Sequence, residues 1–186
     1  MAVFFNSMMA GSYIKVFTAW NPSDKGAGCA LSNLNLTTVF SSPGSVRSVI
    51  AKSSGKWYWE VTVGSPNNSV VGVANSSALM SQYCGSNINS WGWYVGGNVL
   101  NNGSFVNNGA DIYTTGDVLG IALDMDAKTM QCYKNGVSSG TAITGLSATM
   151  YACVGSGGAP TGNTTNFGAS AFSYTPPSGF NSGLYI

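Results

Sequence analysis

The stretch "SSGKWYWEVTV" (residues 53–63) gathers three large aromatic side chains into one short run of the chain. Its second half follows a period of two, which is typical of a β-strand whose two faces differ. One face of this strand would carry Trp57, Trp59, Val61 and Val63, and the other face Tyr58, Glu60 and Thr62. The run therefore predicts a strand, and its aromatic residues form either a core or a binding surface.

The rest of the chain repeats this strand-and-turn pattern, and no segment keeps a helical period beyond two turns. Asn-Gly pairs at 102–103, 108–109 and 135–136 mark turns, and Pro176-Pro177 ends the last run. Further strand-like runs occupy residues 69–75, 90–97, 118–125, 129–134, 137–143, 149–156 and 165–174. Many short strands joined by turns predict an all-β fold, a two-sheet antiparallel β-sandwich or jelly roll.

The chain of 186 residues fits one domain, with residues 1–17 as an N-terminal arm or first strand and residues 181–186 as a C-terminal tail. Only 7% of the residues are charged, against roughly 25% in a typical globular protein, and the net charge is +1. Ser, Asn, Thr and Gly replace the missing charges. Such a surface is typical of a protein that works inside an assembly or meets neutral ligands.

The same composition excludes several classes of function. Lys and Arg form no patch, so we expect no binding to nucleic acid. No apolar run approaches the roughly 18–20 residues that span a bilayer, so we expect no membrane insertion. The start, "MAVFFNSMMAGSYIK", has no basic region before its apolar part, which favours an ordered arm over a signal peptide.

The chain has no histidine, and its cysteines, Cys29, Cys84, Cys132 and Cys153, show no metal-binding spacing. We therefore expect no metal and no cofactor. Cys132 and Cys153 lie in apolar strand-like runs, where a free cysteine behaves as a small hydrophobic residue. Buried free thiols are the favoured interpretation, and a disulfide between Cys132 and Cys153 is the alternative.

Catalytic chemistry has few candidates in this sequence. Without histidine there is no Ser-His or Cys-His pair. The nearest approach to the two carboxylates of a glycosidase is Asp124 with Asp126, at the end of an expected hairpin. Asp is also favoured in turns, where it accepts hydrogen bonds from nearby backbone amides. A turn is the favoured role for this pair, and we expect a protein that is not an enzyme.

Surface aromatic and amide groups are the remaining candidates for a binding site. Trp and Tyr rings stack on the apolar faces of neutral sugars while amides bind the hydroxyl groups. The candidate ligand-binding residues are Tyr83, Trp93, Tyr94, Asn98, Asn101, Asn102 and Tyr113. Against this, strand alternation would turn Trp91 and Trp93 into the core. A core position is favoured for Trp91, and Tyr94 and the asparagine loop are expected to be exposed.

With these strands placed, the chain resembles a SPRY domain of the bacterial and phage-associated branch, over roughly residues 18–180. The strings that carry the resemblance are "AWNPSDKG" (19–26), "LSNLNLT" (31–37), "SVRSVIAKSSGKWYWEVTV" (45–63), "VVGVANSSA" (70–78), "SWGWY" (90–94), "GDVLGIALDMDAKTMQCYKNGV" (116–137) and "TNFGASAFSYTPPSGF" (165–180). The chain departs from the family pattern at Cys132 and Cys153, although both residues are compatible with burial.

The resemblance implies a concanavalin-like β-sandwich that binds other proteins without catalysis. It makes residues 58–61 a core strand, with Glu60 as a hydrogen-bonded structural acid, so the aromatic run of residues 57–59 would form a core. Family ligand sites are built from variable loops at one end of the sandwich, so no family site residue is transferred to this chain.

The resemblance also implies a protein of a phage virion, assembled in the host cytoplasm. We expect a tail or fibre component that recognises a glycan or protein of the bacterial surface. The alternative is a capsid or tail decoration protein that docks through residues 1–17. A polysaccharide-degrading jelly roll is the least favoured hypothesis. Expected partners are other virion proteins and a bacterial surface ligand, with a homo-oligomer as a further option.

Overall fold

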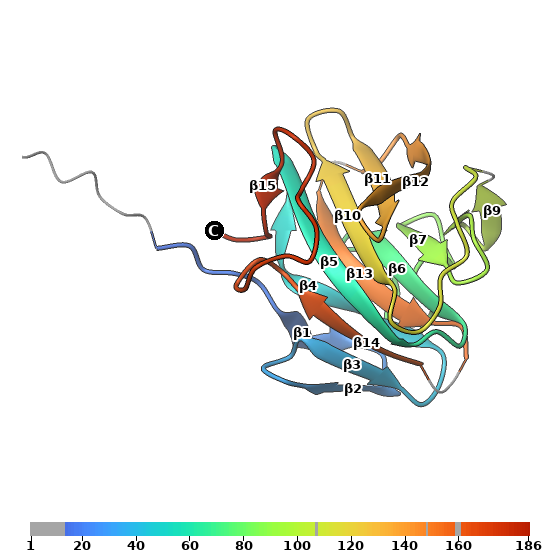
Figure 1. The fold of residues 1–186 in the computed structure, drawn as a ribbon. Coiled ribbons are helices and arrows are strands. Elements are labelled where there is room, and N and C mark those ends of the chain that lie inside the picture. Colours follow the sequence, from blue (N-terminus) through green and yellow to red (C-terminus); the bar gives the residue numbers. More distant parts are fainter. Residues whose placement is uncertain (1–13, 107, 148, 159–160) are drawn as a thin grey trace, which may run out of the picture.

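The computed structural model describes residues 14–106, 108–147, 149–158 and 161–186, which fold into two β-sheets packed face to face (Figure 1). The seven-stranded sheet has the order β1-β4-β13-β6-β7-β8-β9. The eight-stranded sheet has the order β12-β11-β10-β5-β14-β3-β2, and β15 adds to β5. Neighbouring strands are antiparallel except β15, which runs parallel to β5. The predicted all-β sandwich is confirmed, and the described residues contain no helix.

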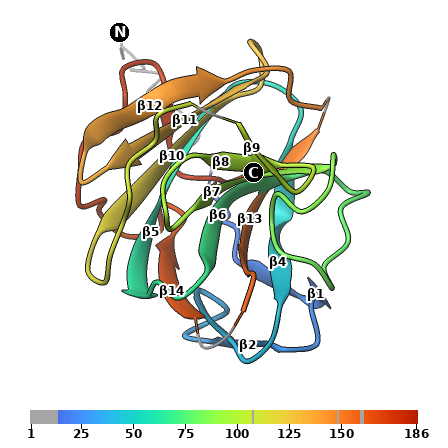
Figure 2. The ribbon, with the colours of Figure 1, turned by 90° about the vertical axis from the view of Figure 1, so that its right-hand side faces the viewer.

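The strands of the seven-stranded sheet are β1 (Trp20–Lys25), β4 (Gly44–Lys52), β6 (Ser69–Ala74), β7 (Ser90–Tyr94), β8 (Val99–Asn101), β9 (Ser104–Val106) and β13 (Met150–Ser156). Those of the eight-stranded sheet are β2 (Cys29–Ser32), β3 (Thr37–Phe40), β5 (Lys56–Ser65), β10 (Val118–Asp124), β11 (Thr129–Lys134), β12 (Val137–Ile143), β14 (Thr161–Asn166) and β15 (Asn181–Ser182). Figure 2 shows the two layers from the side, with β10, β5 and β14 in one layer and β6, β13 and β4 in the other.

Strand β5 contributes to the core between the sheets. Trp59, Val61 and Val63 are buried there, and Trp57 is half-buried at the margin of the same cluster. The opposite face of β5 is also covered near its start, because Tyr58 and Glu60 are buried as well. The aromatic run is thus part of the fold, as the resemblance implied, and it is buried on both faces rather than one.

The segment after β14 covers that second face of β5 (Figure 1). We call residues 168–176 the C-terminal arch. A strand was expected over residues 165–174, but β14 ends at Asn166 and the arch has no regular pairing. The two amides of Ser173 and Tyr174 bond to Glu60 instead of to a neighbouring strand, so the strand-like residues of the arch form no ladder.

The two ends of the described chain lie together at one side of the sandwich. Val16 exchanges backbone hydrogen bonds with Ile186, and Phe17 forms a bridge with Tyr185. Leu184 is fully buried. Residues 181–186, set apart above as a tail, are therefore built into the fold. The expected arm falls mostly on residues 1–13, which lie outside the described residues.

A smaller apolar cluster lies on the outer face of the seven-stranded sheet. We call residues 75–89, which join β6 to β7, the covering loop. Its members Ala78 and Cys84 pack against Val70, Ala74 and Cys153 of the sheet. The covering loop therefore closes over part of this sheet face and leaves the remainder open beside it.

All four cysteines are buried and free. Cys132 belongs to the core between the sheets, whereas Cys153 belongs to the cluster under the covering loop. The thiol interpretation is confirmed, and the layers of the sandwich separate the two residues considered for a disulfide. Burial raises the pKa of Cys132 to about 12, so its thiol stays protonated. Within the described residues there is no cluster of metal-binding side chains, and no helix could cross a membrane.

Candidate functional site

A hollow of about 310 Å³ opens on the outer face of the seven-stranded sheet, between the covering loop and the β8–β9 hairpin. We call it the aromatic pocket. Its lining residues are Asn68, Val70, Tyr83, Tyr94, Leu100, Gly103, Phe105 and Gly157. None of these side chains is charged, so the pocket suits a neutral group.

Strand register places the aromatic rings of the pocket. On β7, Trp93 faces the core and the next residue, Tyr94, therefore faces outward. On the hairpin, Phe105 pairs with Leu100, and Asn102 and Gly103 form the turn with φ of 52° and 70°. Positive φ at both central residues matches the twist of paired strands, which explains the Asn-Gly sequence. The rings of Tyr94 and Phe105 come to 5.9 Å between centroids.

Polar groups at the rim hold these rings in place. The hydroxyl of Tyr94 donates a hydrogen bond to Oδ1 of Asn68 at 3.2 Å. The amide of Gly103 donates to the carbonyl of Gly85 at 3.0 Å, which ties the hairpin to the covering loop. Phe105 is 54% exposed, so much of its ring is open to a ligand.

The covering loop is fixed from several sides. Arg47 forms an ion pair with Asp24 at 2.7 Å and donates to the carbonyl of Asn75 at the start of the loop. The thiol of Cys84 donates to the carbonyl of Trp91 at 3.3 Å, and the amide of Gly85 donates to Oγ of Ser90 at 2.8 Å. One wall of the aromatic pocket is therefore a loop held against the sheet by short contacts.

Glycine at position 92 allows this close approach, and we expect Gly92→Ala to disturb it. A Cβ there would press on Val70 and lie 2.6 Å from the carbonyl oxygen of Cys84, so the covering loop must shift. We expect a loss of about 1–3 kcal/mol in the free energy of unfolding, measured by urea denaturation. Gly162→Ala is the control, because a Cβ at Gly162 meets its nearest atom at 3.4 Å. Equal stability of the two variants would contradict the close packing of the covering loop against Gly92.

The structure places the predicted site residues in three groups. Tyr83 and Tyr94 line the aromatic pocket, and Asn102 is exposed in the turn next to it. Asn98 and Asn101 are half-buried, and their side chains are used within the fold. Oδ1 of Asn98 accepts from the amide of Gly109 at 3.2 Å, and Nδ2 of Asn101 donates to the carbonyl of Ser90 at 2.8 Å.

The prediction of exposed rings is wrong for Trp93 and Tyr113, which are both fully buried. Their rings pack edge to face at 5.3 Å between centroids. Nε1 of Trp93 donates to the carbonyl of Asp111 at 2.9 Å, and the hydroxyl of Tyr113 donates to the backbone carbonyl of Ser69 at 2.7 Å. Trp93 follows the core alternation of Trp91, and Tyr113 reaches inward from a connecting segment, so neither ring can stack on a ligand.

Sequence reasoning missed Phe105, Asn68 and Leu100 as pocket residues. A signal for Phe105 was present, because the Asn102-Gly103 turn sets the hairpin register and puts Phe105 opposite Leu100. No local signal marks Asn68, which reaches the pocket from the turn before β6. Asn108 lies outside this pocket and was not singled out either. It is buried, and it links the two sheets because its Oδ1 accepts from the amide of Val99 in β8 at 3.1 Å and its Nδ2 donates to the carbonyl of Thr141 in β12 at 3.2 Å.

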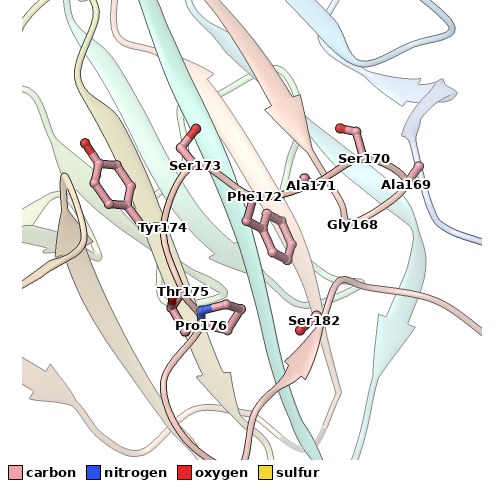
Figure 3. Close-up of a pocket in the computed structure, with 10 residues that line it drawn as sticks. All are labelled: Gly168, Ala169, Ser170, Ala171, Phe172, Ser173, Tyr174, Thr175, Pro176 and Ser182. Carbon is pink, nitrogen blue, oxygen red and sulfur yellow. The ribbon is translucent and has the colours of Figure 1, made fainter.

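A second, larger hollow of about 600 Å³ lies within the curve of the C-terminal arch (Figure 3). Its lining is formed by residues 168–176 and Ser182. Figure 3 shows the rings of Phe172 and Tyr174 pointing in different directions, so they do not face each other across the hollow. Phe172 packs on Tyr58 at 5.2 Å between ring centroids. Small side chains and backbone dominate this surface. The ring of Phe172 serves the packing on β5, whereas the ring of Tyr174 lies close to Gly136 in the turn between β11 and β12.

The carboxylate of Asp124 holds the turn between β10 and β11, and that of Asp126 ties this turn to the turn between β4 and β5. Oδ1 of Asp124 accepts from the amides of Asp126 and Ala127 at 3.0 and 2.9 Å, and Oδ2 pairs with Lys56 at 3.0 Å. Oδ1 of Asp126 accepts from the amide of Gly55 at 2.7 Å. Burial raises the pKa of Asp124, but these hydrogen bonds and Lys56 outweigh it and lower the pKa overall. A general acid requires the opposite shift.

The lowered pKa of Asp124 predicts a pH effect on stability. Its carboxylate contributes stability above its ordinary pKa of 3.8, and this contribution is lost as the pH falls through the lower value of the folded state. We therefore expect Asp124→Asn to be less stable than the wild type at neutral pH and to lose less stability on acidification. Thermal denaturation at a series of pH values measures this. Parallel acid profiles for the two proteins would contradict the role of Asp124.

Comparison with known proteins agrees with the fold. The family model of the SPRY domain matches residues 56–170, more than half of the chain. F-box/SPRY domain-containing protein 1 of Drosophila persimilis is 29% identical over 147 residues, which cover 70% of this chain and 58% of that protein. Ran-binding protein 9 of Xenopus tropicalis is 29% identical over 154 residues, covering 74% of this chain and 27% of that protein. The chain thus spans little more than half of the first of these relatives.

Solved structures show the same architecture. The SPRY domain of human HERC1 superimposes with a TM-score of 0.68 at 22% identity, covering 79% of this chain and 96% of that one. The TRIM65 PSpry domain gives a TM-score of 0.65 at 17% identity, with coverage of 81% and 92%. The relatives from Drosophila, Xenopus and human are eukaryotic proteins, and they give no support to the phage-associated branch expected above. SPRY domains are protein-binding modules that are in general non-catalytic. By its family match and its fold, this chain belongs to the SPRY domain family.

Proposed function

We propose that this SPRY domain binds a protein ligand at the aromatic pocket. The observation that carries the proposal is the set of three rings, Tyr83, Tyr94 and Phe105, around an uncharged hollow of about 310 Å³. Aromatic side chains contribute much of the binding energy of protein interfaces, because they bury large areas with few rotatable bonds. The pocket is therefore the anchor point of the interface.

The lining also selects the ligand. A charged ligand group that entered the pocket would lose its hydration and find no opposite charge there, which costs binding free energy. An uncharged apolar or amide side chain meets the rings, Val70 and Leu100, while the Asn68 side chain and the Tyr94 hydroxyl bond its polar atoms at the rim. The expected ligand is an exposed loop or extended segment of a protein that presents such a residue.

A library of displayed random peptides provides the probe. We expect selection on the wild-type domain to enrich peptides with an uncharged anchor residue. Tyr94→Ala and Phe105→Ala should each weaken binding of an enriched peptide by about tenfold or more. The control is Ile112→Ser, since Ile112 is 63% exposed and lies outside the pocket. If both pocket variants are folded, as judged by circular dichroism, and still bind the enriched peptide as well as the wild type, the aromatic pocket is not the binding site.

A neutral glycan is a second candidate ligand, favoured by the tyrosine rings beside an asparagine amide and by a composition with only 7% charged residues. In that case the protein would be a virion component that recognises a bacterial surface. A virion decoration protein that docks through residues 1–17 is the alternative to such recognition and needs no glycan. Fluorescent wild-type domain applied to a neutral-glycan array tests this. Binding to the array that is lost in Tyr94→Ala would favour a glycan ligand. An array without signal would exclude this hypothesis.

A further inference from the structure

Two of the four buried cysteines lie against each other. Cys84 of the covering loop and Cys153 of β13 share the small apolar cluster on the outer face of the seven-stranded sheet. Cys29 and Cys132 belong instead to the core between the sheets. A hydrogen bond joins the thiols of Cys84 and Cys153. The fold therefore brings together two sulfur atoms that are far apart in the sequence.

Glycines on the outer face of the sheet allow this contact. Gly155 lies on the same face of β13 as Cys153, and a Cβ there would come within 2.9 Å of the backbone nitrogen of Cys84. A Cβ at Gly92 would come within 2.6 Å of the carbonyl oxygen of Cys84. Cys153 itself pairs with Gly72, which pairs with Gly92. The backbone of Cys84 thus lies directly on the sheet beside Cys153, in a row that has no other side chain.

The other contacts of the two thiols are weak. The thiol of Cys84 donates to the carbonyls of Trp91 at 3.3 Å and Val73 at 3.7 Å. The thiol of Cys153 donates to the carbonyl of Val154 at 4.0 Å. Because a thiol is a weak hydrogen-bond donor, a covalent bond between the two sulfurs would replace interactions of little strength.

We propose that Cys84 and Cys153 form a reversible disulfide that fastens the covering loop to β13. The oxidant is a low-molecular-weight disulfide such as oxidised glutathione. The thiolate of Cys84 attacks one glutathione sulfur, the glutathione disulfide bond breaks, and one glutathione thiolate leaves. The thiolate of Cys153 then attacks the Cys84 sulfur of this mixed disulfide and releases the second glutathione thiolate. The two departing thiolates take up the two protons that the cysteines lost, so both cysteines are oxidised and one glutathione disulfide is reduced.

Burial decides when this exchange can occur. Burial and the hydrogen bond to Cys153 raise the pKa of Cys84 well above its ordinary value, so the folded protein holds little thiolate. Exchange is therefore slow while the covering loop is closed and faster when it opens or during folding. The bond closes a long loop of the chain, which restricts the unfolded state. Tyr83, next to Cys84, lines the aromatic pocket, so the disulfide also fixes one wall of that pocket.

Refolding of the full chain in a glutathione redox buffer tests the proposal. The reduced protein, unfolded in urea, is diluted into reduced and oxidised glutathione, which gives every thiol access to the oxidant before burial. Acid quenching, alkylation and peptide mapping by mass spectrometry then identify the bonds. We expect one cross-link, between Cys84 and Cys153. Cys29 and Cys132 are internal controls, because they are buried cysteines that should be alkylated as free thiols. Native protein should form the same cross-link more slowly.

A second measurement tests whether the bond fastens the covering loop. The amide of Gly85, next to Cys84, donates to Oγ of Ser90. We expect hydrogen exchange at Gly85 to be at least about fivefold slower in the oxidised wild type than in the reduced protein, because the disulfide opposes local opening. Cys153→Ala, treated with the same redox buffer, is the matched control, and its exchange at Gly85 should not change.

Three results would overturn the proposal. Folded protein that keeps all four thiols free in the redox buffer does not form the bond. A cross-link that joins Cys29 or Cys132 uses a different pair. A disulfide between Cys84 and Cys153 that leaves exchange at Gly85 unchanged does not fasten the covering loop. Because neither measurement contains a peptide or a glycan, their outcome is independent of ligand binding at the aromatic pocket.

Discussion

Trp93→Ala is expected to lower the free energy of unfolding by about 3–5 kcal/mol, the usual cost of removing a buried tryptophan. Trp93 is fully buried, pairs with Val71 and Val99 in the sheet, and packs against the ring of Tyr113. The substitution also leaves the carbonyl of Asp111 without its indole partner. Urea denaturation followed by tryptophan fluorescence and circular dichroism measures the change.

The neighbouring residue supplies the control for this prediction. Tyr94 is half-buried at the aromatic pocket, so Tyr94→Ala should cost much less stability while it weakens ligand binding by about tenfold or more. Of these two adjacent residues of β7, we expect Trp93 to stabilise the fold and Tyr94 to bind the ligand. A stable Trp93→Ala protein with impaired binding would reverse the assignment and return Trp93 to the site.

Glu60→Ala is expected to lower the free energy of unfolding by about 2–4 kcal/mol, because a buried carboxylate with three donors is lost. Oε2 accepts from the amide of Ser173 at 2.8 Å, and Oε1 accepts from the amide of Tyr174 at 2.9 Å and from the hydroxyl of Tyr58 at 3.2 Å. These bonds attach the C-terminal arch to β5. Hydrogen exchange should show faster exchange of the Ser173 and Tyr174 amides in the variant.

Glu60→Gln distinguishes the hydrogen bonds from simple packing. Glutamine has nearly the same shape, but its NH₂ group would face one of the two donating amides, so we expect it to be destabilising as well. Thr62→Ala is the control on the same strand, since Thr62 is exposed and its replacement should change stability by less than about 0.5 kcal/mol. A Gln variant as stable as the wild type would show that the carboxylate itself is not required.

Part of the candidate site could be predicted from the sequence. Tyr83 and Tyr94 were expected from local pattern, and both line the aromatic pocket. Phe105 follows from the register that the Asn-Gly turn imposes. The amide groups could not be assigned, because an asparagine side chain bonds to whichever backbone groups the fold brings near it. Asn98 and Asn101 are used in this way by segments 11 residues distant along the chain.

The sequence by itself determined the strand periodicity, the turns, the two-layer class and the family, because these depend on neighbouring residues and on short strings. Only the tertiary structure decided which faces are covered. Tyr58 and Glu60 lie on the face of β5 that alternation predicts to be more exposed, and they are buried because a segment more than 100 residues later crosses them. Trp93 is a core residue for a related reason, since a second sheet lies against its side of β7. Burial is a property of contacts between distant segments, and local pattern does not contain it.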